Sequence, residues 1–112
     1  MKIIKLDHFV LTVRNIERTI SFYTSVFGMQ KEVFGQRRVS LKYGDQKINL
    51  HEFGNELEPK AGKPMPGSSD LCVITETHIN EAISHVKRCG VEIIEGPVER
   101  TGATGSIFSF YF

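Results

Sequence analysis

The apolar positions in the first half of the chain change their period, and each change marks a different predicted element. Residues 8–13 are mostly β-branched or apolar, as expected for a short β-strand. Between residues 16 and 27, apolar side chains recur at i, i+4, i+7 and i+11, which predicts one face of an amphipathic helix. Three further strands are predicted at residues 29–34, 38–43 and 47–53.

Polar and turn-forming residues punctuate these elements. Asn15 precedes the helix and is predicted to cap it, because its side-chain oxygen can accept a free amide of the first turn. Gly28 follows the helix, where a left-handed residue ends a helix at low steric cost. Residues 43–46 predict a hairpin turn. Residues 54–69 hold three of the four prolines and predict a long connecting loop.

The second half of the chain repeats the order of the first. A shift of 63 residues aligns Val10 with Val73, and a shift of 62 aligns Gly28 with Gly90. An ordered series of such matches indicates a duplication, which must be recognised before any fold is assigned. We therefore expect an α+β fold made of two related modules.

The second copy is expected to lack one strand of the first. Its predicted elements are a strand from residue 70, a helix capped by Thr77, a strand at 91–95, a Gly-rich loop at 96–105 and a strand at 106–112. The sequence stops within this module. A sheet edge left open there would favour pairing with another chain.

Composition narrows the function classes. The chain has 14 Lys and Arg against 13 Asp and Glu, a balance that offers no broad attraction to nucleic acid or to an anionic membrane. Apolar runs are too short to span a bilayer, and the N-terminus lacks the pattern of a signal peptide. With two cysteines, which we interpret as core thiols (Cys72 and Cys89), we expect a cytoplasmic protein.

Two histidines are predicted to project from the same, open face of the sheet. In residues 8–13, alternation places Phe9, Leu11 and Val13 under the helix and His8 on the opposite face. Alternation likewise places His51 on the face opposite to that of Ile48 and Leu50. A neutral imidazole can ligate a divalent ion, and two on neighbouring strands could share one. Spacing alone favours two hydrogen-bonded polar residues on a half-buried face over a shared ion.

The remaining polar candidates are less specific. Asp70 aligns with Asp7 at a shift of 63 and with His8 at a shift of 62. Because a one-residue change of register moves a side chain to the other face, Asp70 is either a third ligand or a polar residue at a strand end. His78 and His85 are expected at the surface. Arg100, in a Gly-rich segment, could bind a carboxylate or phosphate, although the pattern favours an ordinary surface loop.

A family resemblance runs through the chain. The stretch LDHFVLTVRNIERTISFYTSVFGM resembles the opening of a vicinal-oxygen-chelate module, the superfamily of glyoxalase, bleomycin resistance protein and extradiol dioxygenase. GDQKINLHEFGNE, PGSSDLCVIT and EGPVERTGATG followed by SFYF resemble small glyoxalase-domain-containing proteins. This resemblance implies two tandem βαβββ modules curling around a cavity in a single domain over residues 1–112. The modules would span about 3–53 and 70–112, joined by the 54–69 loop.

The resemblance also implies a divalent metal site. His8 takes the first-strand ligand position, and His51 takes the last-strand position, or Asn49 on the same face, because that strand can slip by two residues. Asp70 is the third ligand under the shift of 62. An acidic residue in a final strand has no counterpart here, and no general base or other catalytic residue is identified. The ion would be nickel, zinc, manganese or iron.

Two functions follow from the resemblance. The first is a metal-dependent lyase, isomerase or dioxygenase that acts on a small oxygenated substrate through bidentate chelation. The second is a metal-free, drug-sequestering module with an aromatic cavity, for which the candidates are Phe34, Tyr43, Phe110 and Phe112. Association into a homodimer is expected in either case.

Overall fold

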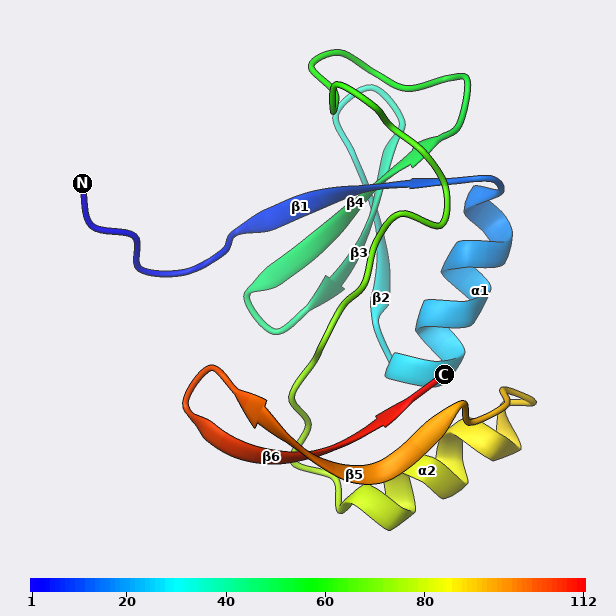
Figure 1. Ribbon diagram of the computed structural model, residues 1–112. Helices are drawn as coiled ribbons and strands as arrows, with labels where there is room; N and C mark the ends of the chain where they lie inside the picture. The colour runs from blue at the N-terminus through cyan, green and yellow to red at the C-terminus, as the bar shows by residue number, and fades with distance from the viewer. The chain divides into compact units, whose positions relative to one another are not determined.

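The computed structural model describes all 112 residues and divides into two compact units, residues 1–71 and 72–112. The first contains β1 (His8–Val13), α1 (Ile16–Phe27), β2 (Gln30–Phe34), β3 (Arg38–Tyr43) and β4 (Gln46–Glu52) (Figure 1). The second contains α2 (Ile79–Arg88), β5 (Glu95–Gly102) and β6 (Gly105–Tyr111). The expected α+β class is confirmed, with fewer strands in the second module. Neither helix is long and apolar enough to cross a bilayer.

The first unit is a four-stranded sheet with α1 on one face. The strand order is β1-β4-β3-β2, with β1 parallel to β4 and the other pairs antiparallel. The predicted two-residue turn joins β3 to β4, with Tyr43 opposite Gln46 and Gly44 at φ +51°. Leu41 and Ile48 are almost completely buried in the core that the sheet forms with α1. The hydrophobic stripe of 16–27 therefore faces the sheet, as its period predicts.

Both ends of α1 are made by the residues that the sequence indicates. The Asn15 side-chain oxygen accepts a hydrogen bond from the Arg18 backbone amide at 2.8 Å. Gly28 adopts the left-handed conformation at φ +67°, and its amide donates to the Thr24 carbonyl. The four stripe residues all belong to the core or pack against it: Ile16, Ile20, Tyr23 and Phe27.

The strands of the second unit differ from the prediction. Residues 70–75 and 91–94 form no strand, whereas β5 covers most of the predicted Gly-rich loop 96–105. β5 pairs antiparallel with β6, and only the short segment between Gly102 and Gly105 turns. Apolar, β-branched residues make a strand only where a second strand offers hydrogen-bond partners, and pairing is not encoded locally.

Two smaller predictions for this unit were also wrong. The helix cap is His78 rather than Thr77, and the His78 ring nitrogen accepts from the Asn80 amide at 3.4 Å. Cys72 is exposed rather than a core thiol, while Cys89 is half-buried. Residues 70–78 form no strand or helix, and α2 begins at Ile79.

Candidate functional site

The face of the first sheet that points away from α1 carries the candidate site. Strand register orders its side chains in three rows across the four strands. One row is Gln30, Lys42, Lys47 and His8; the middle row is Glu32, Ser40, Asn49 and Val10; the last row contains His51 and Thr12. Alternation along β3 and β2 adds Arg38 and Phe34 to the end of the last row. The face predicted from alternation in β1 and β4 is confirmed.

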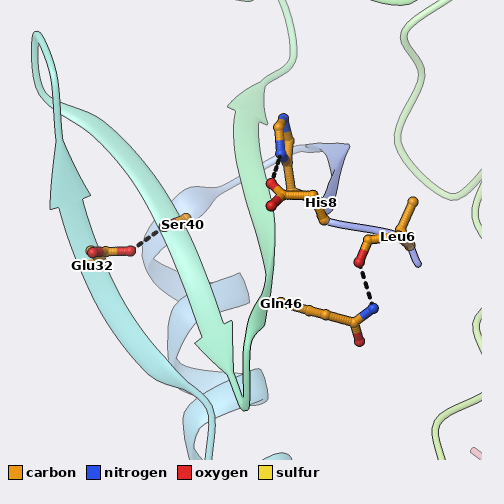
Figure 2. A network of polar contacts seen from close by, with 6 residues as sticks. Leu6, His8, Glu32, Ser40 and Gln46 are labelled. Carbon is orange, nitrogen blue, oxygen red and sulfur yellow. Dashed lines mark hydrogen bonds and ion pairs between the residues drawn. The ribbon is translucent and has the colours of Figure 1, made fainter. Parts of the chain in front are cut away.

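His8 lies at the open end of this face, where β1 begins. Its ring nitrogen Nδ1 is 2.6 Å from Asp7 Oδ1 (Figure 2). This contact holds the Asp7 pKa below its usual range, and the hydrogen bond from His8 is the largest cause. A carboxylate at Nδ1 fixes the proton on that nitrogen and leaves Nε2 with its lone pair, the form in which an imidazole ligates a metal.

The strand end is held in place by a second contact. The Gln46 side-chain amide donates to the Leu6 carbonyl at 2.7 Å, which ties the chain entering β1 to the start of β4 (Figure 2). Beside it is an open hollow of about 340 Å³, lined on one side by Asp7 and Lys47 and on the other by Glu32 and Lys42. The hollow adjoins the row that contains His8.

The middle and last rows of the face hold two buried, unsatisfied polar atoms. His51 is 4 % exposed and Asn49 is 6 % exposed, although both side chains are polar. The buried atoms His51 Nε2 and Asn49 Oδ1 have no hydrogen-bond partner. Burying such an atom unpaired costs about 1–3 kcal/mol, so natural proteins keep few of them. These two atoms therefore require an explanation, and a bound ligand or ion would supply one.

The environment of His51 favours the neutral ring. Burial lowers the pKa of His51, and the positive charge of Arg38 lowers it further. The carboxylates of Glu56 and Glu58, in the segment that follows β4, oppose this effect. A neutral imidazole can ligate an ion or exchange a hydrogen bond with a ligand oxygen.

A half-buried aromatic ring with two cations occupies the same face. Lys47 Nζ lies 3.8 Å from the centre of the Phe34 ring, and the Arg38 guanidinium carbon lies 5.6 Å from it. Cation–π contact favours both arrangements. Phe34 was identified from the sequence as a possible cavity residue; Arg38 and Lys47 were not. The alternation of β3 and β4 places both cations on the face, but only the register shows that they converge.

The structure does not bring the three predicted ligands together. His8 is paired with Lys47, and His51 with Thr12 four residues further along β1. At about 3.3 Å per residue, four residues separate the two histidines by about 13 Å along the sheet. Ligands that share an ion each lie within about 2.1 Å of it. Asn49, the alternative to His51, is only two residues from the His8 row.

A fit to a divalent ion is therefore partial within this unit. His8 Nε2 and the unpaired Asn49 Oδ1 are suitable donors, an imidazole nitrogen and an amide oxygen. Asp70 lies on an exposed stretch outside any strand. No three His, Cys, Asp or Glu side chains lie close enough to form a complete site. His8 and Asn49 could each contribute one ligand to an ion, and a complete site would need further ligands.

The other predicted site residues have structural partners. Tyr43 packs against the core on the α1 side, so its prediction as a cavity residue is wrong. Phe110 and Phe112 stack on one another at 5.3 Å between ring centres, in the second unit. Arg100 donates to Glu95 at 2.8 Å and to Tyr111 at 3.2 Å. These contacts across the β5–β6 hairpin give Arg100 a structural role.

Comparison with known proteins identifies the family. Residues 5–112 match the model of the glyoxalase/bleomycin resistance protein/dioxygenase superfamily. The chain therefore belongs to this superfamily, as the sequence resemblance implies. The first unit runs β1-α1-β2-β3-β4, which is the βαβββ order that the resemblance implies.

Individual relatives agree with this assignment. The virulence protein STM3117 of Salmonella typhimurium is 54% identical over 111 residues, which are 99% of this chain and 77% of that protein. Its crystal structure superimposes with a TM-score of 0.96 over 98% of this chain and 87% of the solved chain. The glyoxalase domain-containing protein RDO1 of Mycosarcoma maydis is 50% identical over 106 residues, 95% of this chain but only 60% of that protein.

A more distant structure shares the fold alone. The fosfomycin resistance protein FosX of Listeria monocytogenes, solved with Mn(II) and sulfate, is 19% identical. It superimposes with a TM-score of 0.58 over 91% of this chain and 74% of that chain.

Proposed function

We propose that this chain belongs to a metal-dependent enzyme of glyoxalase type that acts on a small oxygenated molecule. The observation that supports it is the Asp7–His8 pair, which leaves His8 Nε2 available at the open end of the polar face. A carboxylate behind a histidine is the usual second partner of a metal-ligating imidazole. FosX, which has this fold, was solved with Mn(II).

The ligands would come from more than one part of the protein. His8 and Asn49 are the ligands that the first sheet can bring toward one ion. Asp70 and His51 remain proposed ligands only if their segments move closer to His8. A bound divalent ion would act as a Lewis acid on two adjacent substrate oxygens. Asp7 would keep the His8 ring in one tautomer and orientation, and the polar row beside it would orient the substrate.

Homodimer formation is part of this proposal. Members of the superfamily often form dimers, and a second chain could contribute the ligands that the first sheet lacks. We also propose a cytoplasmic setting, because neither of the two cysteines forms a disulfide. Light scattering after size-exclusion chromatography, with and without metal, would measure the assembly; a monomer under both conditions would contradict the dimer.

The metal site can be tested by thermal unfolding of chelator-treated protein with nickel, zinc, manganese or iron(II). An ion at about 100 times its dissociation constant stabilises a protein by about 2.7 kcal/mol. For a domain of this size, that corresponds to a rise in Tm on the order of 10 °C. His8→Ala should abolish the rise, and Asp7→Asn should reduce the affinity about 10- to 100-fold. His85→Ala, which removes an imidazole from the second unit, is the control.

The competing function is metal-free binding of a small molecule. Its supporting observation is the half-buried Phe34 ring at the β2 edge of the polar face. If no ion changes the Tm of the wild-type protein, this alternative replaces the enzyme. If metal raises the Tm of His8→Ala as much as it raises the Tm of His85→Ala, the ion binds elsewhere and the assignment of His8 as a ligand is wrong.

A further inference from the structure

The segment that enters β1 is tied to the start of β4 at two consecutive carbonyl groups. This segment belongs to no helix or strand. The Leu6 carbonyl accepts a hydrogen bond from the side-chain amide of Gln46 at 2.7 Å (Figure 2). The next carbonyl, that of Asp7, accepts from the backbone amide of Lys47 at 3.3 Å. Backbone pairing therefore reaches only the second carbonyl, and a side chain holds the first.

These two hydrogen bonds restrain the backbone on both sides of Asp7. The peptide group that joins Leu6 to Asp7 is held by Gln46. The peptide group that joins Asp7 to His8 is held by Lys47. Because each peptide group is planar, the two soft dihedral angles of Asp7 lie between two held planes. The direction in which the Asp7 side chain leaves the backbone is restrained with them.

An ion pair holds the same segment one residue earlier. The Lys5 ammonium contacts the carboxylate of Asp45, the turn residue directly before β4. The hydrogen bond from Lys5 is the largest cause that holds the pKa of Asp45 below its usual range. Both side chains are largely exposed, so this attraction is weak and decreases with salt. The ion pair therefore adds to the hydrogen bond of Gln46 and does not replace it.

The contact between Asp7 and His8 depends on this restrained backbone. Asp7 Oδ1 lies 2.6 Å from His8 Nδ1, although the Asp7 side chain is 79 % exposed. In a regular strand, the side chains of neighbouring residues point to opposite faces, which would separate the carboxylate from the ring. Asp7 lies just outside β1, where its backbone is set by the two anchored peptide groups.

We propose that Gln46, supported by Asp45, is a positioning residue for the metal ligand His8. Its hydrogen bond to Leu6 keeps the backbone at Asp7 in the conformation that brings the carboxylate to His8 Nδ1. The carboxylate in turn keeps the proton on Nδ1 and the lone pair on Nε2, the nitrogen that would ligate the ion. The proposal rests on the proposed function for the role of His8 as a ligand, but the positioning of the ring can be tested without metal.

The first measurement is the tautomer of His8 in the full, metal-free chain. Nitrogen-15 NMR at about pH 8, where a histidine ring is ordinarily neutral, shows which ring nitrogen carries the proton. We expect the Nδ1–H form to predominate at His8. Gln46→Met keeps the length of the side chain but removes its donor, and it should shift His8 toward the mixture of tautomers of a free histidine. The other three histidines, in the same spectrum, should not change.

Two further variants control this measurement. Gln36→Met makes the same change at an exposed position in the β2–β3 turn and should leave the His8 tautomer as in the wild-type protein. Asp45→Asn should shift the tautomer in the same direction as Gln46→Met, but by less, and its effect should disappear at high salt. A thermal scan verifies that each variant is folded. If Gln46→Met does not fold, Asp45→Asn replaces it in the test.

The second measurement is the affinity for the ion that raises the Tm of the wild-type protein, by titration calorimetry. Gln46→Met should weaken binding about 3- to 10-fold, as expected for the loss of one neutral hydrogen bond. Because Gln46 acts through Asp7, the same change should have no further effect in a protein that already carries Asp7→Asn. A residue that only stabilises the fold would instead add its loss to that of Asp7→Asn.

Two results would overturn the proposal. One is an unchanged His8 tautomer in Gln46→Met, and the other is an equal loss of metal affinity from Gln46→Met with and without Asp7→Asn. Failure of the proposed function gives a different result. If no ion raises the Tm but the His8 tautomer depends on Gln46, the metal site is wrong and the positioning of the ring stands. If metal binds through His8 but the tautomer does not depend on Gln46, the positioning role alone is wrong.

Discussion

The unpaired amide oxygen of Asn49 makes an unusual prediction: its replacement by leucine should stabilise the protein. Asn49 is 6 % exposed, its Oδ1 is buried, and its side chain makes no hydrogen bond in the sheet. Leucine has a similar shape and no polar atom. The variant removes a desolvation penalty of about 1–3 kcal/mol, which burial of an unsatisfied oxygen imposes.

The magnitude follows from the size of the domain. A gain of about 1–2 kcal/mol in the free energy of unfolding should raise the Tm by about 4–15 °C. The assay is chemical denaturation of the wild-type and Asn49→Leu proteins, both without metal or ligand, together with a thermal scan. The slope of unfolding against denaturant should not change, since the buried surface is nearly the same.

A matched control is available on the neighbouring strand. Thr12 is 8 % exposed and lies on the same face, but its hydroxyl is not an unpaired buried atom. Thr12→Val is therefore expected to leave stability unchanged or to lower it. If Asn49→Leu loses more than about 1 kcal/mol, the oxygen is satisfied in the native protein and the reasoning is wrong. A stabilised variant that no longer binds metal would show that the polar atom is kept for function.

Two further predictions concern pH and packing. Because the pKa of His51 is lower in the folded than in the unfolded chain, the unfolded state binds the proton first as pH falls below about 6.5. The free energy of unfolding should therefore decrease below this pH, by at most about 1.4 kcal/mol per pH unit for one proton. Urea denaturation at pH 8, 6 and 5 measures this decrease. The decrease should be smaller in His51→Asn than in the wild-type protein. Gly96→Ala should destabilise the second unit by about 2 kcal/mol or more, since a Cβ at φ +108° would lie 2.6 Å from the Ser109 carbonyl oxygen. Gly105→Ala has a similar backbone conformation but open space, so an equal loss in both variants, measured by thermal scans, would refute the steric argument.

Local sequence closely predicted the bounds of the elements in the first module, because the residues at their ends favour the caps and turns that the fold requires. The helix has its cap at Asn15 and its stop at Gly28, and the β3–β4 turn is short and glycine-containing. The second module was predicted less well. Residues 70–75 have the composition of a strand but pair with nothing in their unit, while 96–102 have the composition of a loop and pair with β6.

The sequence by itself determined which side chains share the polar face, because alternation along a strand fixes the side on which each residue lies. It placed His8, Asn49 and His51 there correctly. Only the tertiary structure decided which of them meet, since the register of β1 against β4 is set by long-range pairing. That register separates His8 from His51, and the registers of β2, β3 and β4 bring Arg38 and Lys47 to one aromatic ring. The folded sheet leaves one side-chain atom each of Asn49 and His51 buried without a partner. The sequence of each strand determines which side chains lie on the face. Which of these side chains come close together is decided only when the strands pair.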